Sequence, residues 1–219
     1  MGDSLSRLIM ERPPLVDDAY TERARKLASS LLSDALKTPC AMDYGIKPVA
    51  PRMRILGTAM TVTLKPGDNL FLHKAIYLSG RGYVLVADGK GFAHGAAWGE
   101  MTTRAAMAVG IEGIVLDGFT RDLAEIRELG FPVFARGTVP GGVNRMGPGG
   151  INTVISCGGI TVAPGDLVLG DEDGVVAVPR DRIAETVLEA EKMAAQEQVR
   201  INEIAQGRLE PEWLKQKFA

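Results

Sequence analysis

The chain has 219 residues, 46% hydrophobic and 24% charged, which is long enough to bury a substantial core without disulfides or bound metals. Its 25 basic and 27 acidic side chains give a formal net charge of -2 with no run of Lys and Arg, so we expect no nucleic-acid partner. No segment approaches the roughly 18 apolar residues of a membrane span or resembles a signal peptide, which predicts a cytoplasmic protein without membrane contact. Cys40 and Cys157 lack partners at metal-ligand spacing and are expected to be buried, reduced thiols.

Apolar residues recur at helical spacing near both ends of the chain, and the region between them alternates strand and helix patterns. Pro13 and Pro14 stand ahead of the first helical segment, and Gly207 marks the end of the last. The predicted elements, in chain order, are N-terminal helices at 15–37, a strand at 53–64, a helix at 68–79, a strand at 83–87, a helix at about 98–109, a strand at 113–117, a helix at 121–129, a strand at 132–135, short strands within 150–178 and a C-terminal helix at 181–206.

The region 53–136 alternates short apolar strands with helices, which is typical of right-handed crossovers and of a parallel sheet covered on both faces. The region 150–178 has short strands separated by the tight turns PGD and DEDG, which favours an antiparallel sheet. DEDG, at 171–174, resembles a metal loop but is interpreted as a hairpin turn. The sequence therefore predicts an α/β fold with a central parallel sheet, an antiparallel sheet and flanking helices, in a single domain at 1–219.

In an open parallel sheet, ligands bind beyond the carboxyl ends of the strands. Two neighbouring strands end here in the polar loops ADGKGFAHG (87–95) and LDGFTRD (116–122). Arg121 offers a planar fork that matches a carboxylate, and Asp122 offers hard oxygens suited to a divalent cation such as Mg²⁺ or Mn²⁺. The alternative is that Asp122 caps the following helix and Arg121 pairs with a surface acid.

The segment GEMTTRAAMAVG (99–110) contains a helix start preceded by glycine, a geometry that directs unpaired N–H groups at an anion. Glu100 either reaches the metal, directly or through water, or is a first-turn acid favoured by the helix dipole. His94 faces the same crevice and is a candidate substrate contact or acid/base group, whereas His73, within an amphipathic helix, is interpreted as structural.

The same region imitates a nucleotide-binding fold. Gly89, Gly91 and Gly95 follow a strand, and Asp117 ends the next strand, where a dinucleotide or S-adenosylmethionine site has its ribose-binding acid. The residues AAWGE, however, separate Gly95 from the helix start, so the helix does not begin at the glycine loop. A nucleotide- or S-adenosylmethionine-binding enzyme is kept as one alternative.

Three segments together resemble the RraA-like family over roughly residues 30 to 207: GEMTTRAAMAVGIEGIVLDGFTRD, GFPVFARG and PGDLVLGDEDGVVAVP. That family includes class II 4-hydroxy-4-methyl-2-oxoglutarate / 4-carboxy-4-hydroxy-2-oxoadipate aldolases, which also decarboxylate oxaloacetate, and non-catalytic regulators of RNase E. The resemblance implies a swivelling β/β/α fold that assembles as a homotrimer or a dimer of trimers, with active sites between subunits.

The resemblance also implies roles for individual residues. Arg121 would bind pyruvate and its enolate, Asp122 would hold the divalent metal, and Glu100 would lie in the metal's surroundings. Backbone amides of the turn formed by Gly99, Glu100, Met101 and Thr102 would take the pyruvate carboxylate. Glu197, on the last helix, is similar to a glutamate that a neighbouring subunit contributes.

Because Arg121, Asp122 and Glu100 are all present, the chain resembles the enzymes more than the regulators. The implied activity is a metal-dependent carbon–carbon lyase acting on a small 2-oxo acid, with no need of a Schiff-base lysine. The residues EMTT and FT differ from those usual in the family beside the pocket, which leaves the substrate beyond its pyruvoyl part open. A regulator or scaffold that binds a protein partner is the second alternative.

Overall fold

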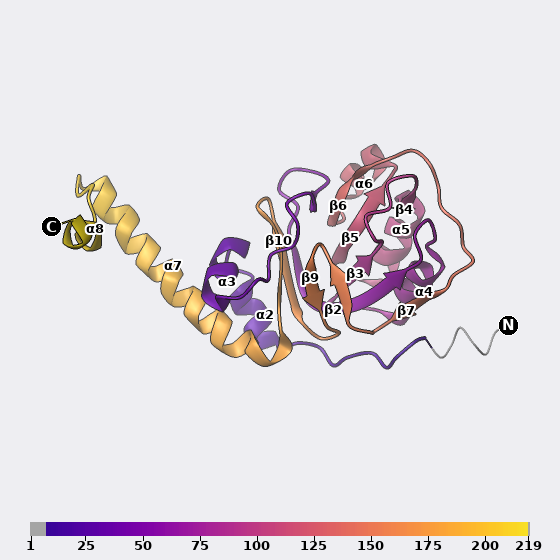
Figure 1. The fold of residues 1–219 in the computed structure, drawn as a ribbon, viewed down its shortest axis with the longest axis horizontal. Coiled ribbons are helices and arrows are strands. Elements are labelled where there is room, and N and C mark those ends of the chain that lie inside the picture. Colours follow the sequence, from indigo (N-terminus) through magenta and orange to yellow (C-terminus); the bar gives the residue numbers. More distant parts are fainter. Residues whose placement is uncertain (1–7, 219) are drawn as a thin grey trace.

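The computed structural model describes residues 8–218 and shows a mixed sheet flanked by helices, with a long C-terminal helix that projects away from the sheet (Figure 1). The strands are β1 (Lys47–Pro48), β2 (Ile55–Leu64), β3 (Tyr83–Asp88), β4 (Ala96–Trp98), β5 (Gly113–Thr120), β6 (Val133–Thr138), β7 (Gly149–Ile151), β8 (Ile155–Cys157), β9 (Ile160–Val162), β10 (Leu167–Asp171) and β11 (Gly174–Val178). The helices are α2 (Asp18–Ala24), α3 (Ser29–Leu36), α4 (Leu70–Leu78), α5 (Glu100–Val109), α6 (Leu123–Leu129), the 3-10 turn η1 (Arg180–Arg182), α7 (Ile183–Ala205) and α8 (Glu212–Phe218).

The main sheet has the strand order β1-β6-β5-β3-β2-β10-β11, with β4 beside β5 and β7 beside β2. Strands β2, β3, β5 and β6 are parallel to one another, and β10 pairs antiparallel with both β2 and β11. The predicted α/β class is confirmed. The β-rich C-terminal part divides, however: β8 and β9 form a separate antiparallel pair, whereas β10 and β11 extend the main sheet, with the predicted hairpin turn between them.

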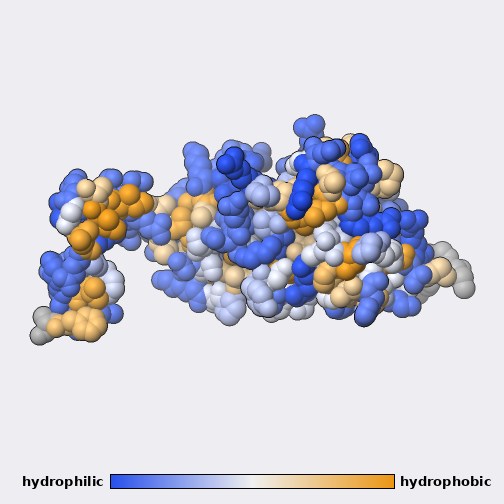
Figure 2. All heavy atoms as spheres, turned by 90° about the horizontal axis from the view of Figure 1, so that it is seen from above, coloured by the Kyte–Doolittle hydropathy of each residue, from blue (hydrophilic) through white to orange (hydrophobic). Residues whose placement is uncertain are grey.

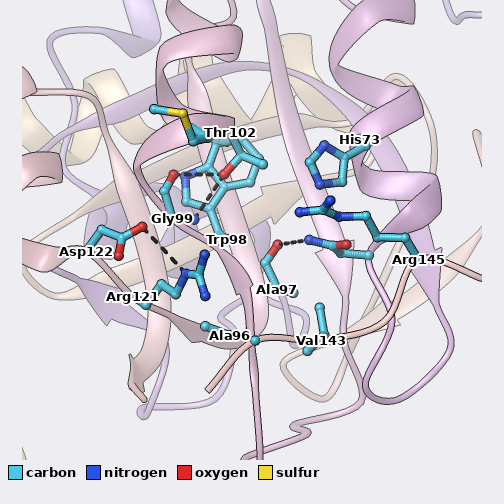
Figure 3. A pocket seen from close by; sticks show the side chains of 13 residues that line it. His73, Ala96, Ala97, Trp98, Gly99, Thr102, Arg121, Asp122, Val143 and Arg145 are labelled. Atoms are coloured by element: carbon cyan, nitrogen blue, oxygen red, sulfur yellow. Dashed lines mark hydrogen bonds and ion pairs between the residues drawn. The ribbon is translucent and has the colours of Figure 1, made fainter. Parts of the chain in front are cut away.

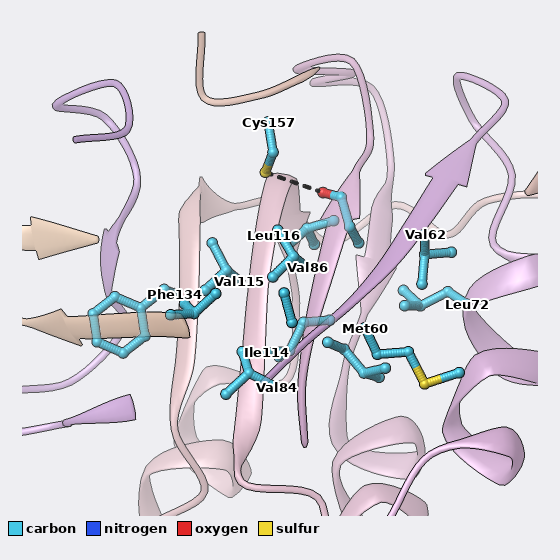
Figure 4. Packing of buried hydrophobic residues seen from close by; sticks show 14 of the residues in the cluster. Met60, Val62, Leu72, Val84, Val86, Ile114, Val115, Leu116, Phe134 and Cys157 are labelled. Carbon is cyan, nitrogen blue, oxygen red and sulfur yellow. Dashed lines mark hydrogen bonds between the residues drawn. The ribbon is translucent and has the colours of Figure 1, made fainter. Parts of the chain in front are cut away.

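Helices α4, α5 and α6 cover one face of the parallel strands, because right-handed crossovers between strands laid down in one direction place successive helices on the same side. Successive residues of β2, β3 and β5 are buried almost without a break, so both faces of these strands are covered, and both are therefore apolar. Met60 of β2, Val84 of β3 and Ile114 of β5 are completely buried, and Leu72 of α4 lies on the side of the sheet where Met60 points (Figure 4). This core fixes the strand ends on which the candidate site is built.

A second apolar cluster joins the other end of the sheet to the terminal helices. Successive residues of β10 alternate between the two clusters, so that Leu167 and Leu169 contact the helical cluster while Val168 faces the main core. Helices α2 and α3 pack on this end of the sheet, and α7 packs on them. Both cysteines are free and buried, as predicted, and burial raises the pKa of the Cys157 thiol well above its usual range.

The strand at 113–117 is longer than predicted. It continues to Thr120, and α6 begins only at Leu123, so Arg121 and Asp122 occupy the turn between strand and helix rather than the first turn of the helix. The extension is held by β4, a short strand that the sequence pattern did not indicate. Among the helices of residues 8–218, none combines the length and apolar character needed to cross a membrane.

Candidate active site

A cavity of about 170 Å³ opens at the end of β5, between the start of α5, the start of α4 and the loop that follows β6 (Figure 3). It is smaller than the roughly 300–1,000 Å³ typical of sites for drug-sized ligands, which suits a small metabolite. Two sets of side chains face each other across it. The strand-end half consists of Trp98, Gly99, Met101, Thr102, Arg121 and Asp122, and the loop half consists of Asn69, His73, Val143 and Arg145.

Asp122 adopts a left-handed backbone conformation, with φ 56° and ψ 48°, which aspartate tolerates better than most residues. It stands at the N-cap position of α6, but its side chain makes no capping hydrogen bond to that helix. The carboxylate instead crosses to α5, where Oδ2 accepts a hydrogen bond from the Glu100 amide at 2.9 Å. The alternative of an ordinary cap on the following helix is therefore not what the structure contains.

Arg121 passes through a slot between two glycines. A Cβ at Gly99 would lie 3.1 Å from Arg121 Cγ and 2.5 Å from Asp122 Oδ2, and a Cβ at Gly142 would lie 3.3 Å from Arg121 Nη1. The Arg121 amide donates to the Trp98 carbonyl, and Arg121 Nε lies 3.6 Å from Asp122 Oδ2. The missing side chains thus let the guanidinium and the carboxylate share one wall of the cavity.

The first turn of α5 presents amides to the same wall. The Gly99 amide donates to Thr102 Oγ1 at 3.0 Å and the Thr103 amide donates to the Gly99 carbonyl, so these two groups are satisfied locally. The Met101 and Thr102 amides have no acceptor within residues 8–218. Because unpaired amides at a helix start attract anions, this turn and Arg121 together offer the kind of donors that a carboxylate ligand requires.

Among the residues that line this wall of the cavity, one carboxylate, that of Asp122, is available to a metal. Residues 8–218 contain no group of three or more His, Cys, Asp or Glu side chains able to hold a metal ion. The Glu100 amide uses one oxygen of Asp122, which leaves the other for a ligand. Mg²⁺ is commonly held by one or two carboxylates together with waters and substrate oxygens, so Asp122 fits such an ion but forms no cage by itself.

The structure brings together only some of the residues named from the sequence. Gly99, Met101, Thr102, Arg121 and Asp122 line the cavity.

Three others do not line it. The Glu100 carboxylate turns outward and pairs with Arg104 at 2.8 Å. His94 is exposed, with its ring edge-on to Phe92 at 5.6 Å between centroids. Glu197 is exposed on α7, a helix that projects away from the sheet and from α5 (Figure 1).

Sequence reasoning missed the loop half. It assigned a structural role to His73, yet this imidazole lies against the cavity, where burial and the nearby charge of Arg145 lower its pKa. Asn69 follows the carboxyl end of β2, so the rule that selected Arg121 also pointed to this position. Arg145 lies in a glycine-rich loop with no periodic pattern, and no local signal singled it out.

The structure does not support Asp117 as the ribose-binding acid of a nucleotide or S-adenosylmethionine site. Asp117 is buried, and its two carboxylate oxygens accept hydrogen bonds from Arg136 Nε at 2.5 Å and from the Gly158 amide at 2.8 Å. A carboxylate used in this way has no oxygen directed at a ribose. The cavity beside β5 is also small for a dinucleotide.

The fold and the cavity define an α/β protein in which a guanidinium, a carboxylate and helix-start amides line one small cavity beyond a parallel strand. The family model described as RraA-like, Aldolase/RraA, matches residues 29–177, so the chain belongs to the RraA-like family.

The relatives fall into more than one functional group. A protein of Halalkalibacterium halodurans named "Putative 4-hydroxy-4-methyl-2-oxoglutarate aldolase" is 37% identical over 181 residues, 83% of this chain and 86% of the relative. The structure of an uncharacterized protein from Pseudomonas syringae pv. tomato has a TM-score of 0.79 at 29% identity, covering 89% of this chain and 96% of the other. Streptomyces coelicolor RraAS2, described as an unusual member of the RNase ES inhibitor RraA protein family, has a TM-score of 0.77 at 28% identity, with 87% and 98% covered.

Proposed function

We propose that the protein is a divalent-metal-dependent lyase that cleaves a 4-hydroxy-2-oxo diacid, or decarboxylates oxaloacetate, through the enolate of pyruvate. One observation carries the proposal: Arg121, Asp122 and the unpaired amides of Met101 and Thr102 line one small cavity. The aldolase name of the Halalkalibacterium relative supports the same reaction class.

The chain's own groups match the charges of this reaction. The Met101 and Thr102 amides take the substrate's C1 carboxylate, and Arg121 faces the C2 oxygen. When the C3–C4 bond breaks, its electron pair passes into the pyruvoyl part and negative charge grows on the C2 oxygen, beside the guanidinium. In the aldol case the C4 hydroxyl loses its proton to solvent and C4 becomes a carbonyl, while C3 regains a proton to give pyruvate.

Asp122 would hold the divalent cation, Mg²⁺ or Mn²⁺, through the carboxylate oxygen that the Glu100 amide leaves available. Such an ion supplies Lewis-acid stabilisation of the developing oxyanion. Glu100 would contact the metal only through water, because its carboxylate pairs with Arg104.

The C-terminal helices support a homo-oligomer, which we propose to be a trimer or a dimer of trimers. Figure 2 shows apolar side chains gathered on the projecting end of α7 and on α8. Exposed among them are Val199, Ile201, Ile204, Trp213 and Phe218. A second copy of the chain would cover this surface, and Glu197 would reach a site only across such an interface.

A regulator that binds a protein partner is the second candidate, favoured by the RNase-inhibitor family of the Streptomyces relative and by the same apolar surface. Turnover separates the two candidates, because a regulator needs no reaction at the cavity. A cytoplasmic location stays a prediction from the sequence.

The direct test is pyruvate release from oxaloacetate and from 4-hydroxy-4-methyl-2-oxoglutarate, with EDTA and then with Mg²⁺ or Mn²⁺ restored. We expect activity to disappear with the chelator and to return with metal. Full activity in EDTA would contradict the metal requirement, and no turnover with any 2-oxo acid would favour the regulator.

Arg121→Lys tests the guanidinium in the same assay. Comparing this variant with the unaltered protein at the same metal concentration also corrects for oxaloacetate that free metal decarboxylates without the protein. The lysine keeps the charge but loses the planar fork, so kcat/KM should fall at least about tenfold, short of the roughly 100- to 1,000-fold cost of losing a whole oxyanion donor. Arg127→Lys is the matched control, because Arg127 is exposed and, within residues 8–218, its side chain donates only to the Val49 carbonyl. An unchanged kcat/KM for Arg121→Lys would remove this residue from the site.

A further inference from the structure

Strand β5 has one residue more than its neighbour β6 just before the candidate site. The register of this parallel pair shifts after Leu116. Two residues of β5, Asp117 and Gly118, then lie opposite the single residue Arg136 of β6. Such a β-bulge is rare between parallel strands, and bulges are over-represented next to active sites, where they redirect a side chain. This bulge precedes Arg121 on the same strand end.

The extra residue changes the face of the sheet to which Arg121 points. Side chains alternate along a regular strand, so residues 117 and 121 would share a face. In the structure, Asp117 accepts from the Gly158 amide of the β8–β9 hairpin, whereas Arg121 lies against Gly99 at the start of α5. The hairpin and α5 cover opposite faces of the sheet (Figure 1). Because side-chain direction in a strand has a period of two, the insertion of one residue turns Arg121 toward the cavity.

An ion triad holds the bulge on the face away from the cavity. Arg136 Nε donates to Asp117 Oδ1 at 2.5 Å, and Arg136 Nη1 donates to Asp43 Oδ1 at 2.7 Å. Asp117 is buried, and the Gly158 amide occupies its other oxygen. The Asp43 amide donates in turn to the Gly158 carbonyl at 2.7 Å. The planar guanidinium opposite the bulge therefore fixes the direction of two carboxylates.

The glycine loop at 87–95 holds the backbone of the bulge. The Asp117 carbonyl accepts a hydrogen bond from the Gly91 amide at 3.0 Å. A Cβ at Gly89 would lie 2.7 Å from the same carbonyl oxygen, so this close approach requires glycine. Two glycines of the segment that resembles a nucleotide-binding loop in the sequence are thus explained by their contact with the bulge.

Beyond the bulge, two hydrogen bonds connect the end of β5 to the residue before the α5 turn. Thr120 Oγ1 and the Arg121 amide both donate to the Trp98 carbonyl, at 3.2 and 3.1 Å. A shift of β5 at Asp117 would therefore move Arg121 relative to the helix start that forms the other part of this wall. Reacting groups misplaced by about 1 Å can lose about 100-fold in rate.

We propose that Asp117 and Arg136 are positioning residues of the active site: their ion pair fixes the bulge in β5, and the bulge directs Arg121 into the cavity. Neither residue is among those that line the described cavity. The inference rests on the proposed function for the role of Arg121. It adds to that function two charged residues on the opposite face of the sheet, whose effect on the reaction passes through Arg121.

Asp117→Asn tests the position of β5 without an assay of turnover. Asparagine keeps the size of the side chain, and Arg136 retains its ion pair with Asp43, so the variant should fold. Hydrogen exchange measured by NMR should become at least about tenfold faster at the amides of Arg121 and Val139, which bond to the Trp98 carbonyl and to the end of β5. Exchange in β10 should not change, which excludes a general loss of stability.

Three further variants bracket this result. Arg136→Met should match Asp117→Asn, whereas Arg136→Lys, which keeps one charged donor, should retain part of the protection. Asp166→Asn is the matched control, because Asp166 is also buried and also accepts from two backbone amides. It lies beside Ala59, toward the amino end of β2, away from the cavity.

A double-mutant cycle with Arg121 separates positioning from a general effect on the enzyme. Asp117→Asn alone should lower kcat/KM for oxaloacetate about 10- to 100-fold. In an Arg121→Met background the same change should lower it less than about threefold, because the group that Asp117 positions is already absent. A merely structural role would give the same factor in both backgrounds.

Unchanged exchange of both amides in Asp117→Asn, or an equal fall of kcat/KM in the two backgrounds, would overturn the proposal. The exchange measurement is independent of turnover, so failure of the lyase function is recognised separately. A protein that releases no pyruvate, but whose Arg121 amide exchanges faster in Asp117→Asn, would reject the lyase function and keep the role of the bulge.

Discussion

The two halves of the cavity differ in what holds them in place. Backbone geometry fixes the strand-end half. Because Gly99 has no side chain, Arg121 and Asp122 approach the start of α5 more closely than a Cβ would allow. Asp122 has a left-handed backbone conformation, and its carboxylate accepts a hydrogen bond from the Glu100 amide of α5.

The loop half depends on side chains, because the Asp68 carboxylate ties down the loop. Two buried atoms of this half, Asn69 Oδ1 and His73 Nε2, lack partners among the described residues.

For the function proposed above, this difference would separate the groups that react from the groups that select the substrate. Groups that stabilise developing charge must be held within fractions of an ångström, and backbone geometry provides that precision. Backbone strain of the kind seen at Asp122 is often found at functional sites. A loop held by a few hydrogen bonds accepts substitutions more easily, so substrate preference can change there without disturbing the reacting groups.

Gly99→Ala should have the largest effect and would break the strand-end half. The φ of Gly99 is -174°, so alanine causes no backbone strain, but its Cβ would meet Asp122 Oδ2 at 2.5 Å. We expect kcat/KM for oxaloacetate to fall about 100-fold, the cost of misplacing reacting groups by about 1 Å. Gly80→Ala is the control, because the nearest atom to its Cβ is 3.9 Å away. Near-normal activity in Gly99→Ala would mean that this close contact is not needed.

Asp68→Asn should have an intermediate effect and acts on the loop half. The asparagine amide has the same shape as the carboxylate but lacks its negative charge, which strengthens the hydrogen bonds that Asp68 accepts from the Met146 and Gly147 amides. Arg145, which lines the cavity, should then be less well positioned for an anionic substrate, so KM for oxaloacetate should rise about three- to tenfold, equivalent to about 1 kcal/mol. Asp34→Asn, an exposed acid on α3, is the control. A KM equal to that of the unaltered protein would show that the loop does not depend on Asp68.

His94→Ala should have the smallest effect and sharpens the boundary of the site. An acid/base group contributes about 100-fold or more to a rate, whereas an exposed side chain outside the cavity changes the free energy by about 0.5 kcal/mol or less. Because His94 is exposed beside Phe92, we expect kcat/KM to change less than about twofold. A loss above tenfold would return His94 to the list of candidate proton-transfer groups.

Much of the fold could be predicted because local periodicity encodes it. The two N-terminal helices, the alternation from β2 to β6 and the hairpin turn before Gly174 all follow from patterns within a few residues. Strand β4 and the extension of β5 were missed, since each is stabilised by the other and neither is a strong strand by itself.

The sequence alone determined that Arg121 and Asp122 follow a buried strand. It also determined that a helix start preceded by Gly99 lies near them along the chain. Only the tertiary structure decided which side chains face this pair across the cavity. It placed His73 and Arg145 there and kept His94 out, although His94 is nearer to Arg121 in sequence than His73 is. The physical reason is that side-chain periodicity records which face of an element is buried, whereas the meeting of α4 with the loop after β6 depends on strand order and on the long-range hydrogen bonds of Asp68 and Asn144.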